Sequence, residues 1–191
     1  MSQLILASKS NYKRELLNQL NVPFLNIAPS FIEEEHKSEK TGIDLSEFLA
    51  YQKAQSILDV HRNSVIIACD QTIYLEKQRF DKPHTKEKAI AQLKQLQGKT
   101  HHLTSTYCIL NKDNQILKSI SATLKMRALT NDEIIRYIEI DKPFDCAGSY
   151  KLESLGISLF DSINTEDFTT ITGLPLISIS KDLRTLGFKI P

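Results

Sequence analysis

Residues 3–20 read QLILASKSNYKRELLNQL and place a short apolar run directly before a helical pattern. The run Gln3–Ala7 is typical of a short buried strand. After a polar stretch, Leu16, Leu17 and Leu20 recur at helical spacing and give the next segment one apolar side. Strands that alternate with amphipathic helices are the pattern of α/β proteins, so this stretch predicts that class.

Strands and helices continue to alternate along the chain, and a long hairpin follows in its second half. The expected strands are Phe24–Ala28, Ser64–Cys69, Thr100–Leu110, Gln115–Leu129 and Ile157–Ile163, and the expected helices are Asp44–Val60, Thr85–Leu96, one that starts at the capping box Thr130–Glu133, and Pro175–Leu186. The pattern predicts an α/β fold with a mixed sheet. The hairpin strands exceed the usual ~5 to 6 residues. Strands of this length often extend from one lobe of a protein into another, so we expect two lobes that flank a central cleft. No linker separates two parts of the chain, so we expect a single domain over residues 1–191.

The composition is ordinary for a soluble globular protein, with 41% hydrophobic and 25% charged residues among 191. The 24 Lys and Arg residues nearly balance the 23 Asp and Glu residues, and a net charge of +1 argues against a nucleic-acid coat. No stretch reaches the ~20 apolar residues of a membrane span. The three cysteines are far apart and form no CxxC pair, which argues against a disulfide framework or a zinc knuckle and favours a cytoplasmic location.

The polar segment Ser8–Arg14 joins the first strand to the first helix. Backbone N–H groups and the helix dipole favour an anion at a helix N-terminus, and two hydroxyls and three cations lie in this segment. It lacks the glycines of a Walker loop. From spacing alone, a phosphate cradle and an ordinary capped helix both remain open.

Three charged residues further along are candidates for chemistry. Asp70 directly follows the strand Ser64–Cys69, so its carboxylate is expected to be partly desolvated and to need a metal, a cation or hydrogen bonds. Lys53 borders the apolar side of its helix, where a lysine either extends to solvent or points into a site. Glu33 opens the acidic run Glu33–Glu35, which is either solvated or supplies oxygen ligands for Mg²⁺.

In chain order, these pieces resemble the Maf-like nucleoside triphosphate pyrophosphatases. The first matching segment is LILASKSNYKRELL (4–17), which looks like the opening S-x-S-x-x-R segment of that family. The others are AP (28–29), QKA (52–54), CDQ (69–71), DKP (81–83), GKTH (98–101), CAGS (146–149), ESLG (153–156) and GLP (173–175). Together they cover nearly the whole chain, and the ordered set is highly specific. The resemblance implies a Maf-like and Ham1-like fold, similar to inosine triphosphate pyrophosphatases.

The same resemblance implies hydrolysis of a nucleoside triphosphate between its α and β phosphates. The products would be a nucleoside monophosphate and pyrophosphate, with Mg²⁺ or Mn²⁺ as the cofactor. It implies Asp70, Lys53 and Lys82 as catalytic residues, Ser8 and Arg14 as substrate-binding residues, and Glu33 and Asp70 as metal ligands.

Three positions indicate the substrate within this family. Gln71 and Glu153 are similar to the branch that hydrolyses 7-methyl-GTP, whereas the dTTP/UTP branch carries Thr and Gln there. The third position is Tyr12, where the first branch often has Trp. A 7-methylguanine ring is positively charged, which suits an aromatic face and a carboxylate, and Gln71 offers a donor and an acceptor to the base. We therefore expect 7-methyl-GTP as the substrate, and the removal of modified nucleotides before they enter nucleic acid as the role.

One departure from the family pattern concerns the metal. Ile32 stands where the family usually has an aspartate before Glu33, and Glu34 or Glu35 is the candidate replacement. This departure keeps a non-hydrolytic nucleotide-binding regulator of cell division as an alternative, beside a dTTP/UTP pyrophosphatase of the same family. The expected partner is a small-molecule nucleoside triphosphate, with no nucleic acid and no membrane, and the family's habit of forming dimers makes a homodimer one option.

Overall fold

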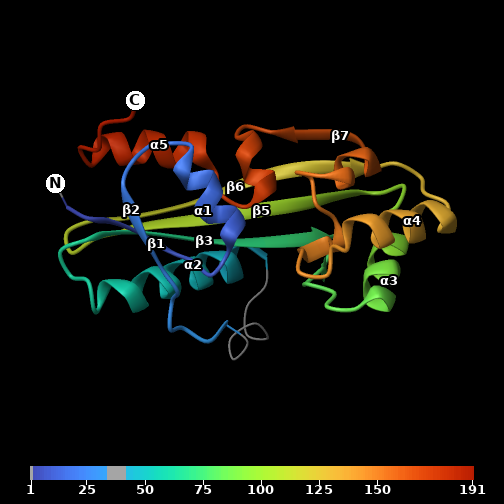
Figure 1. Cartoon of the computed structure of the whole chain (residues 1–191), viewed down its shortest axis with the longest axis horizontal. Coiled ribbons are helices and arrows are strands. Elements are labelled where there is room, and N and C mark those ends of the chain that lie inside the picture. Colours follow the sequence, from blue (N-terminus) through green and yellow to red (C-terminus); the bar gives the residue numbers. More distant parts are fainter. Residues whose placement is uncertain (1, 34–41) are drawn as a thin grey trace. The chain divides into compact units, whose positions relative to one another are not determined.

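The computed structural model describes residues 2–33 and 42–191 (Figure 1). The strands are β1 (Leu4–Ala7), β2 (Phe24–Ile27), β3 (Val65–Leu75), β4 (Gln78–Arg79), β5 (Thr100–Leu110), β6 (Gln115–Met126) and β7 (Phe160–Thr165). The helices are α1 (Asn11–Asn18), α2 (Gly42–Leu58), α3 (Lys86–Leu96), α4 (Asn131–Asp141) and α5 (Leu176–Thr185). Within these residues, every helix is too short or too polar to cross a membrane.

The strands form one mixed sheet in the order β2-β1-β3-β5-β6-β7, with β4 paired to β3. Strand β1, next to the edge strand β2, runs parallel to both β2 and β3. The pairs β3–β4 and β6–β7 are antiparallel. The structure therefore confirms the predicted α/β class with a mixed sheet.

The chain divides into two compact units, and neither is a continuous segment. The first unit consists of residues 1–71, 104–120 and 167–191, and the second of residues 72–103 and 121–166. The long strands β3, β5 and β6 each have residues in both units. The two predicted lobes are thus confirmed, while the cleft expected between them stays a prediction.

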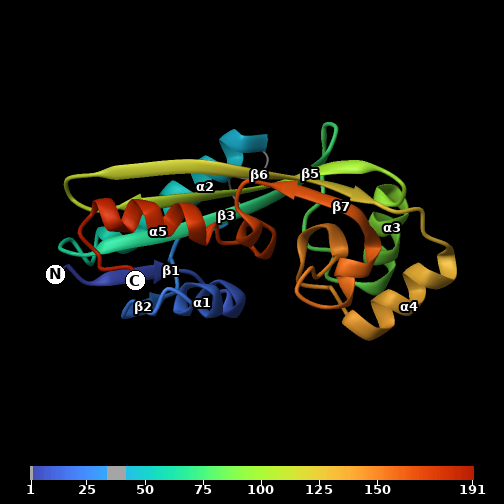
Figure 2. The same cartoon turned by 90° about the horizontal axis from the view of Figure 1, so that it is seen from above.

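The first unit has an apolar layer on each face of its part of the sheet. Successive side chains of a strand point to opposite faces, and Leu4 and Leu6 accordingly belong to a different apolar cluster from Ile5 and Ala7. The first cluster contains side chains of α1 and α5, and the second contains side chains of α2. Figures 1 and 2 show the same arrangement, with α2 on one side of β1 and β3 and with α1 and α5 on the other.

The second unit is held by α3, α4 and a buried aromatic group. The two helices contact each other, and the predicted capping box of α4 is present, since the side chains of Thr130 and Glu133 bond each other's backbone N–H. His101 is fully buried and its Nε2 lies 3.0 Å from the Tyr150 hydroxyl. The ring of Phe160 packs against both.

Some predicted boundaries were wrong, and one of them bears on function. The strand expected to end at Cys69 continues through Asp70 and Gln71 to Leu75. Thr72 and Ile73 favour a strand, and β3 then pairs with β4 across a tight turn, which the apolar run alone did not indicate. Asp70 therefore lies within a strand rather than after one.

The other boundary errors are smaller. The strand expected from Ile157 begins only at Phe160, because residues Leu155–Leu159 form a 3₁₀ turn. The second hairpin strand ends at Met126 instead of Leu129. Asp44 lies in the first turn of α2 rather than at its N-cap.

Candidate active site

A buried lysine joins two carboxylates in the first unit. The Nζ atom of Lys53, on α2, donates to Asp70 Oδ1 at 2.6 Å and lies 2.9 Å from Glu33 Oε1. Lys53 is 7% exposed and Asp70 is 8% exposed, so this ion pair is shielded from water. Lys53 therefore does not extend to solvent, and its role in a site stays a prediction.

The charges around Lys53 keep it protonated. Burial by itself lowers the pKa of Lys53, but the charges of Asp70 and Glu33 and their hydrogen bonds outweigh burial and raise the pKa above its ordinary value. Lys53 is therefore a fixed positive charge between two carboxylates. Such a charge balances the carboxylates beside it and can also face a phosphate.

The donor set suits a divalent cation that also binds a phosphate. Mg²⁺ prefers oxygen ligands and is commonly held by one or two carboxylates together with substrate phosphates. Glu33 and Asp70 supply two carboxylates that meet at one nitrogen atom. Among the described residues, no group of three or more His, Cys, Asp or Glu side chains could hold a metal by itself. Glu34 and Glu35, the candidate replacements for the acid missing at Ile32, lie outside the described residues.

The segment after β1 places a lysine beside this cluster. Ser10 is the N-cap of α1, and the Ser8 hydroxyl accepts a bond from the Ser10 N–H at 3.0 Å. The Nζ atom of Lys13 donates to the Cys69 carbonyl oxygen at 2.7 Å, directly before Asp70. Arg14, the cation expected to bind the substrate, is exposed.

Lys13 is the residue that the sequence analysis missed. The S-x-S-x-x-R spacing, counted from Ser8 and Ser10, places its cation at position 13 rather than at Arg14. The spacing was therefore a sufficient signal, and the presence of a lysine in place of an arginine concealed it.

Gln71 lies on the opposite face of β3 from Asp70, as adjacent strand residues do. Its Nε2 atom donates to Ser105 Oγ at 3.1 Å and to the Thr170 carbonyl oxygen at 3.0 Å. The backbone of Gly173 passes close by, since a Cβ at that position would lie 3.8 Å from Gln71 Nε2 and 3.5 Å from Lys13 Cε. Gln71 is thus held firmly on the face of the sheet that carries α1.

Asp70 and Gln71 nevertheless share one edge of the sheet. Pairing between β1 and β3 covers Val65–Ile67, so both residues lie past the carboxyl end of β1. Ligands of open α/β sheets bind outside the carboxyl ends of the strands. A ligand at this edge can contact groups on both faces.

The remaining predicted residues lie at the surface. Tyr12 lies on α1 and is 40% exposed. Lys82 and Glu153 are exposed and belong to the second unit. The structure brings together Lys53, Asp70 and Glu33, and leaves the roles of Lys82 and Glu153 as predictions.

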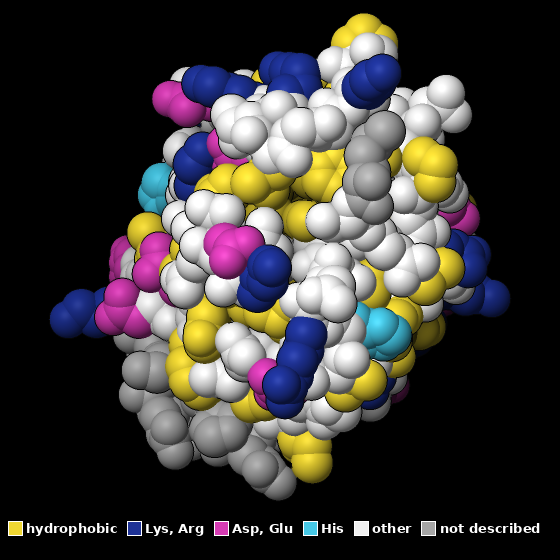
Figure 3. All heavy atoms as spheres, turned by 90° about the vertical axis from the view of Figure 1, so that its left-hand side faces the viewer, with side chains coloured by type: hydrophobic (Ala, Val, Ile, Leu, Met, Phe, Trp, Pro, Cys, Tyr) yellow, Lys and Arg dark blue, Asp and Glu magenta, His cyan; other side chains and the backbone are white. Residues whose placement is uncertain are grey.

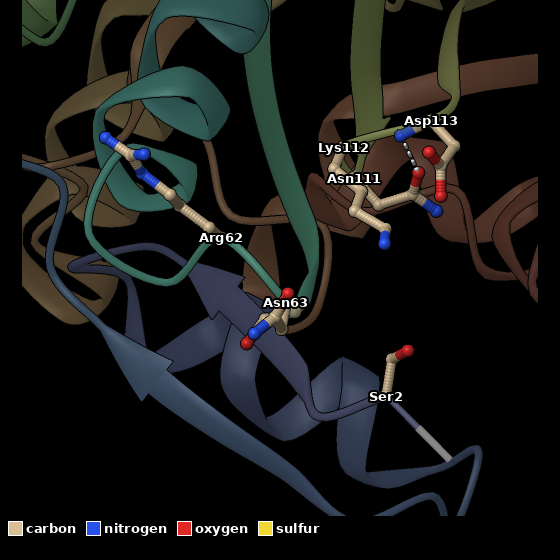
Figure 4. A pocket seen from close by; sticks show the side chains of 7 residues that line it. Ser2, Arg62, Asn63, Asn111, Lys112 and Asp113 are labelled. Atoms are coloured by element: carbon tan, nitrogen blue, oxygen red, sulfur yellow. Dashed lines mark hydrogen bonds between the residues drawn. The ribbon is translucent and has the colours of Figure 1, made fainter.

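A small pocket lies elsewhere on the first unit. Its volume is about 160 Å³, and it is lined by Ser2, by residues 62–64 directly before β3 and by residues 111–113 in the turn of the β5–β6 hairpin (Figure 4). In that turn, Asn111 Oδ1 accepts a bond from the Asp113 N–H at 2.9 Å, which accounts for the predicted hairpin. The pocket thus lies before the first residue of β3, whereas Asp70 lies in the middle of that strand.

Three features lie near the carboxyl end of β1: the N-terminus of α1, the buried Lys53 ammonium and two carboxylates that converge on it. Such groups are typical of proteins that bind phosphorylated ligands together with a divalent cation. The model of the Maf-like protein family matches residues 3–186. The chain belongs to this family.

Curated relatives match the chain over its full length. A 7-methyl-GTP pyrophosphatase of Bdellovibrio bacteriovorus is 43% identical over 182 residues, which is 95% of each chain. Another from Pseudomonas aeruginosa is 38% identical over 193 residues and 100% of each chain. A nucleoside triphosphate pyrophosphatase of Acinetobacter baylyi is 37% identical over 203 residues, covering 100% of this chain and 98% of that protein. The solved Ham1 protein of Staphylococcus aureus covers 65% of this chain and 72% of its own, with 14% identity and a TM-score of 0.46, which is too low to support an argument.

Proposed function

We propose that this protein hydrolyses 7-methyl-GTP to 7-methyl-GMP and pyrophosphate. The observation that carries the proposal is the buried Lys53 ammonium shared by Asp70 and Glu33 at the carboxyl end of β1. This arrangement supplies a base, a fixed cation and two metal ligands within hydrogen-bond distance of one atom. Full-length relatives named 7-methyl-GTP pyrophosphatase support the choice of substrate.

The proposed reaction is attack of water on the α-phosphorus. The bond between this phosphorus and the bridging oxygen breaks, and pyrophosphate leaves with the electron pair. Asp70 accepts the proton of the attacking water, and the hydrogen bond from Lys53 holds its carboxylate in place. A divalent cation held by Glu33 and Asp70 would supply neutralisation of the phosphate charge.

The cations are proposed to bind the triphosphate, because phosphoryl transfer depends mainly on positioning and charge neutralisation. Lys53 and Lys13 lie at the site edge in the first unit. Ser8 adds a hydroxyl at the same strand end. Arg14 and Lys82 are exposed and reach the phosphates only if the ligand extends to them.

The base is proposed to be read by Tyr12, Gln71 and Glu153. The exposed ring of Tyr12 offers a face to the cationic 7-methylguanine ring, an interaction of roughly 0.5–2 kcal/mol. Glu153 adds a carboxylate that can accept N–H groups of the base. The proposed cellular role is the removal of modified nucleotides, in the cytoplasm, by one domain over residues 1–191 that can form a homodimer.

The surface supports a small ligand rather than a long polyanion. On the face shown in Figure 3, Lys and Arg side chains lie among acidic, polar and apolar ones. With a net charge of +1 over the whole chain, phosphate binding depends on a few placed charges.

The test is pyrophosphate release from a panel of triphosphates in the presence of Mg²⁺. We expect release from 7-methyl-GTP, and release from dTTP or UTP alone would reject the substrate. Tight binding without release from any triphosphate would favour the regulator. Asp70→Asn should lower turnover at least ~100-fold. Asp182→Asn is the matched control, because Asp182 is also buried and paired to a lysine but lies on α5.

A further inference from the structure

We propose that Ser105 and Thr170 are positioning residues that fix the orientation of the Gln71 amide, so that Gln71 Oε1 accepts hydrogen bonds from the N–H groups of a ligand base. This inference rests on the proposed function, because it concerns how the same site selects its base. It starts from the two hydrogen bonds of the Gln71 side chain.

The identity of the amide nitrogen follows from its partners. The backbone carbonyl oxygen of Thr170 can only accept, so the Gln71 atom 3.0 Å away must be a donor. Ser105 Oγ lies 2.9 Å from the same carbonyl oxygen and donates its one hydrogen there. The Ser105 oxygen therefore also accepts from Gln71, at 3.1 Å. Both partners require nitrogen at this position and exclude the flipped amide.

Both acceptors lie on one side of the amide nitrogen. Ser105 Oγ and the Thr170 carbonyl oxygen are 2.9 Å apart, and Nε2 lies 3.1 Å and 3.0 Å from them, so the nitrogen stays turned toward this pair. Ser105 and Thr170 are both fully buried, so water does not compete for these bonds. Oε1 lies on the other side of the amide carbon, and it is the amide atom that we assign to a ligand.

This restriction has a consequence for selectivity. A free glutamine can rotate its amide and bind either a donor or an acceptor on a base, and hence distinguishes bases poorly. An Oε1 atom in a fixed position accepts from N–H groups and repels carbonyl oxygens. Guanine presents N–H groups on two neighbouring atoms, whereas thymine presents one N–H group between two carbonyl oxygens. The lock therefore favours a guanine-type base over a thymine-type base at the position of Gln71.

Gln71 is also placed where such a contact is useful. It lies past the carboxyl end of β1, and the Lys13 stem and the Gly173 backbone adjoin its amide. Gly173 has φ 101°, a conformation that favours glycine, and this brings the backbone close to the amide. Thr170 and Gly173 belong to one loop, so the residues that hold Gln71 and those that surround it come from the same segment.

The first test measures kcat and KM for 7-methyl-GTP and for dTTP. Ser105→Ala should raise KM for 7-methyl-GTP and lower the ratio of the two kcat/KM values by about 3- to 10-fold, the effect of one hydrogen bond. Ser105→Thr keeps the hydroxyl and should restore the ratio. Ser46→Ala is the matched control, because Ser46 is equally buried and its hydroxyl bonds Thr106 on the same strand. An equal loss for both substrates, or an unchanged ratio, would overturn the proposal.

The second test does not depend on activity. Hydrogen exchange of the Gln71 side-chain amide, assigned by its loss in Gln71→Met, should be slow in the wild-type protein and faster in Ser105→Ala, in which only the bond to the Thr170 carbonyl oxygen remains. Exchange in the wild type as fast as that of an exposed glutamine would refute the lock without any variant. If the wild type releases no pyrophosphate from either nucleotide, the proposed function fails. The exchange rate of the Gln71 amide still shows whether Ser105 and Thr170 hold that amide in one orientation.

Discussion

Replacing Lys53 with methionine removes the charge that two carboxylates share. Methionine has a similar length, so the variant keeps much of the packing and loses the ammonium. Loss of one partner of a buried ion pair typically costs about 3–5 kcal/mol. The Asp70 side chain is 11% exposed, but that of Glu33 is 35% exposed and can be hydrated. We therefore expect the lower end, about 3 kcal/mol, which for a chain of this size is about 6–12 °C in Tm.

The assay is urea unfolding at pH 7.5, with chelator and then with millimolar Mg²⁺. Mg²⁺ should restore part of the lost stability of Lys53→Met, since two unpaired carboxylates bind it, and should change the wild type less. Lys118→Met is the control, because Lys118 also pairs with a buried aspartate, Asp182, yet is 47% exposed and replaceable by water. A loss below ~1 kcal/mol in Lys53→Met, the size of an exposed pair, would refute the reasoning.

The pH dependence gives a second check of the same pair. The pKa of Lys53 is raised above its ordinary value of 10.5 in the folded protein. The stability due to this charge is complete below that value and is lost as the pH rises through the folded pKa. Lys53→Met should lack that alkaline loss, while the wild type should show it.

Three further predictions concern the second unit. Burial lowers the pKa of His101 to about 4, so the stability contributed by the neutral imidazole is complete above the ordinary value of 6.5 and is lost as the pH falls toward 4. In urea unfolding, His101→Leu should remove about 3 kcal/mol of the stability change between these pH values, and an unchanged pH dependence would contradict this. Gly156→Ala should lower the free energy of unfolding by more than about 3 kcal/mol, because a Cβ there would overlap the Lys151 carbonyl oxygen. Gly98→Ala, at φ 68° with no other atom within 4 Å, should lower it by only ~1 kcal/mol, and equal effects in thermal unfolding would be inconsistent with the contact at Gly156. Thr130→Ala removes the capping box of α4 and should lower stability by about 1 kcal/mol without changing pyrophosphate release, and a loss of release would show that the helix end acts on the site.

The parts of the fold that the sequence predicts are those with local signals. The apolar run of β1, the helical spacing of α1 and the capping box of α4 each appear within a few residues of chain. The end of β3 was missed because a strand that continues through charged and polar residues has no apolar run to mark it. Asp70 is such a residue, since Lys53 neutralises it from another element.

The site was predictable as a set of residues but not as an arrangement. The spacing around Lys53 left two orientations open, and only the long-range contact with Asp70 decides between them. The lock on Gln71 has no local signal at all, because its partners lie 34 and 99 residues away along the chain. Contacts of this separation follow from topology, which residue spacing does not encode.

The order in which the first unit can be completed during synthesis follows from its discontinuous chain. Leu4 and Leu6 emerge from the ribosome early, yet the cluster that buries them includes Leu176, Ile179 and Leu183 of α5. Domains generally fold as units as the chain emerges, and contacts of long range are formed slowly. The face of β1 that carries Leu4 and Leu6 therefore lacks the part of its cover that α5 supplies until nearly the whole chain has been translated. A chain that stops before α5 would leave that face open to chaperones, proteases or another copy of itself.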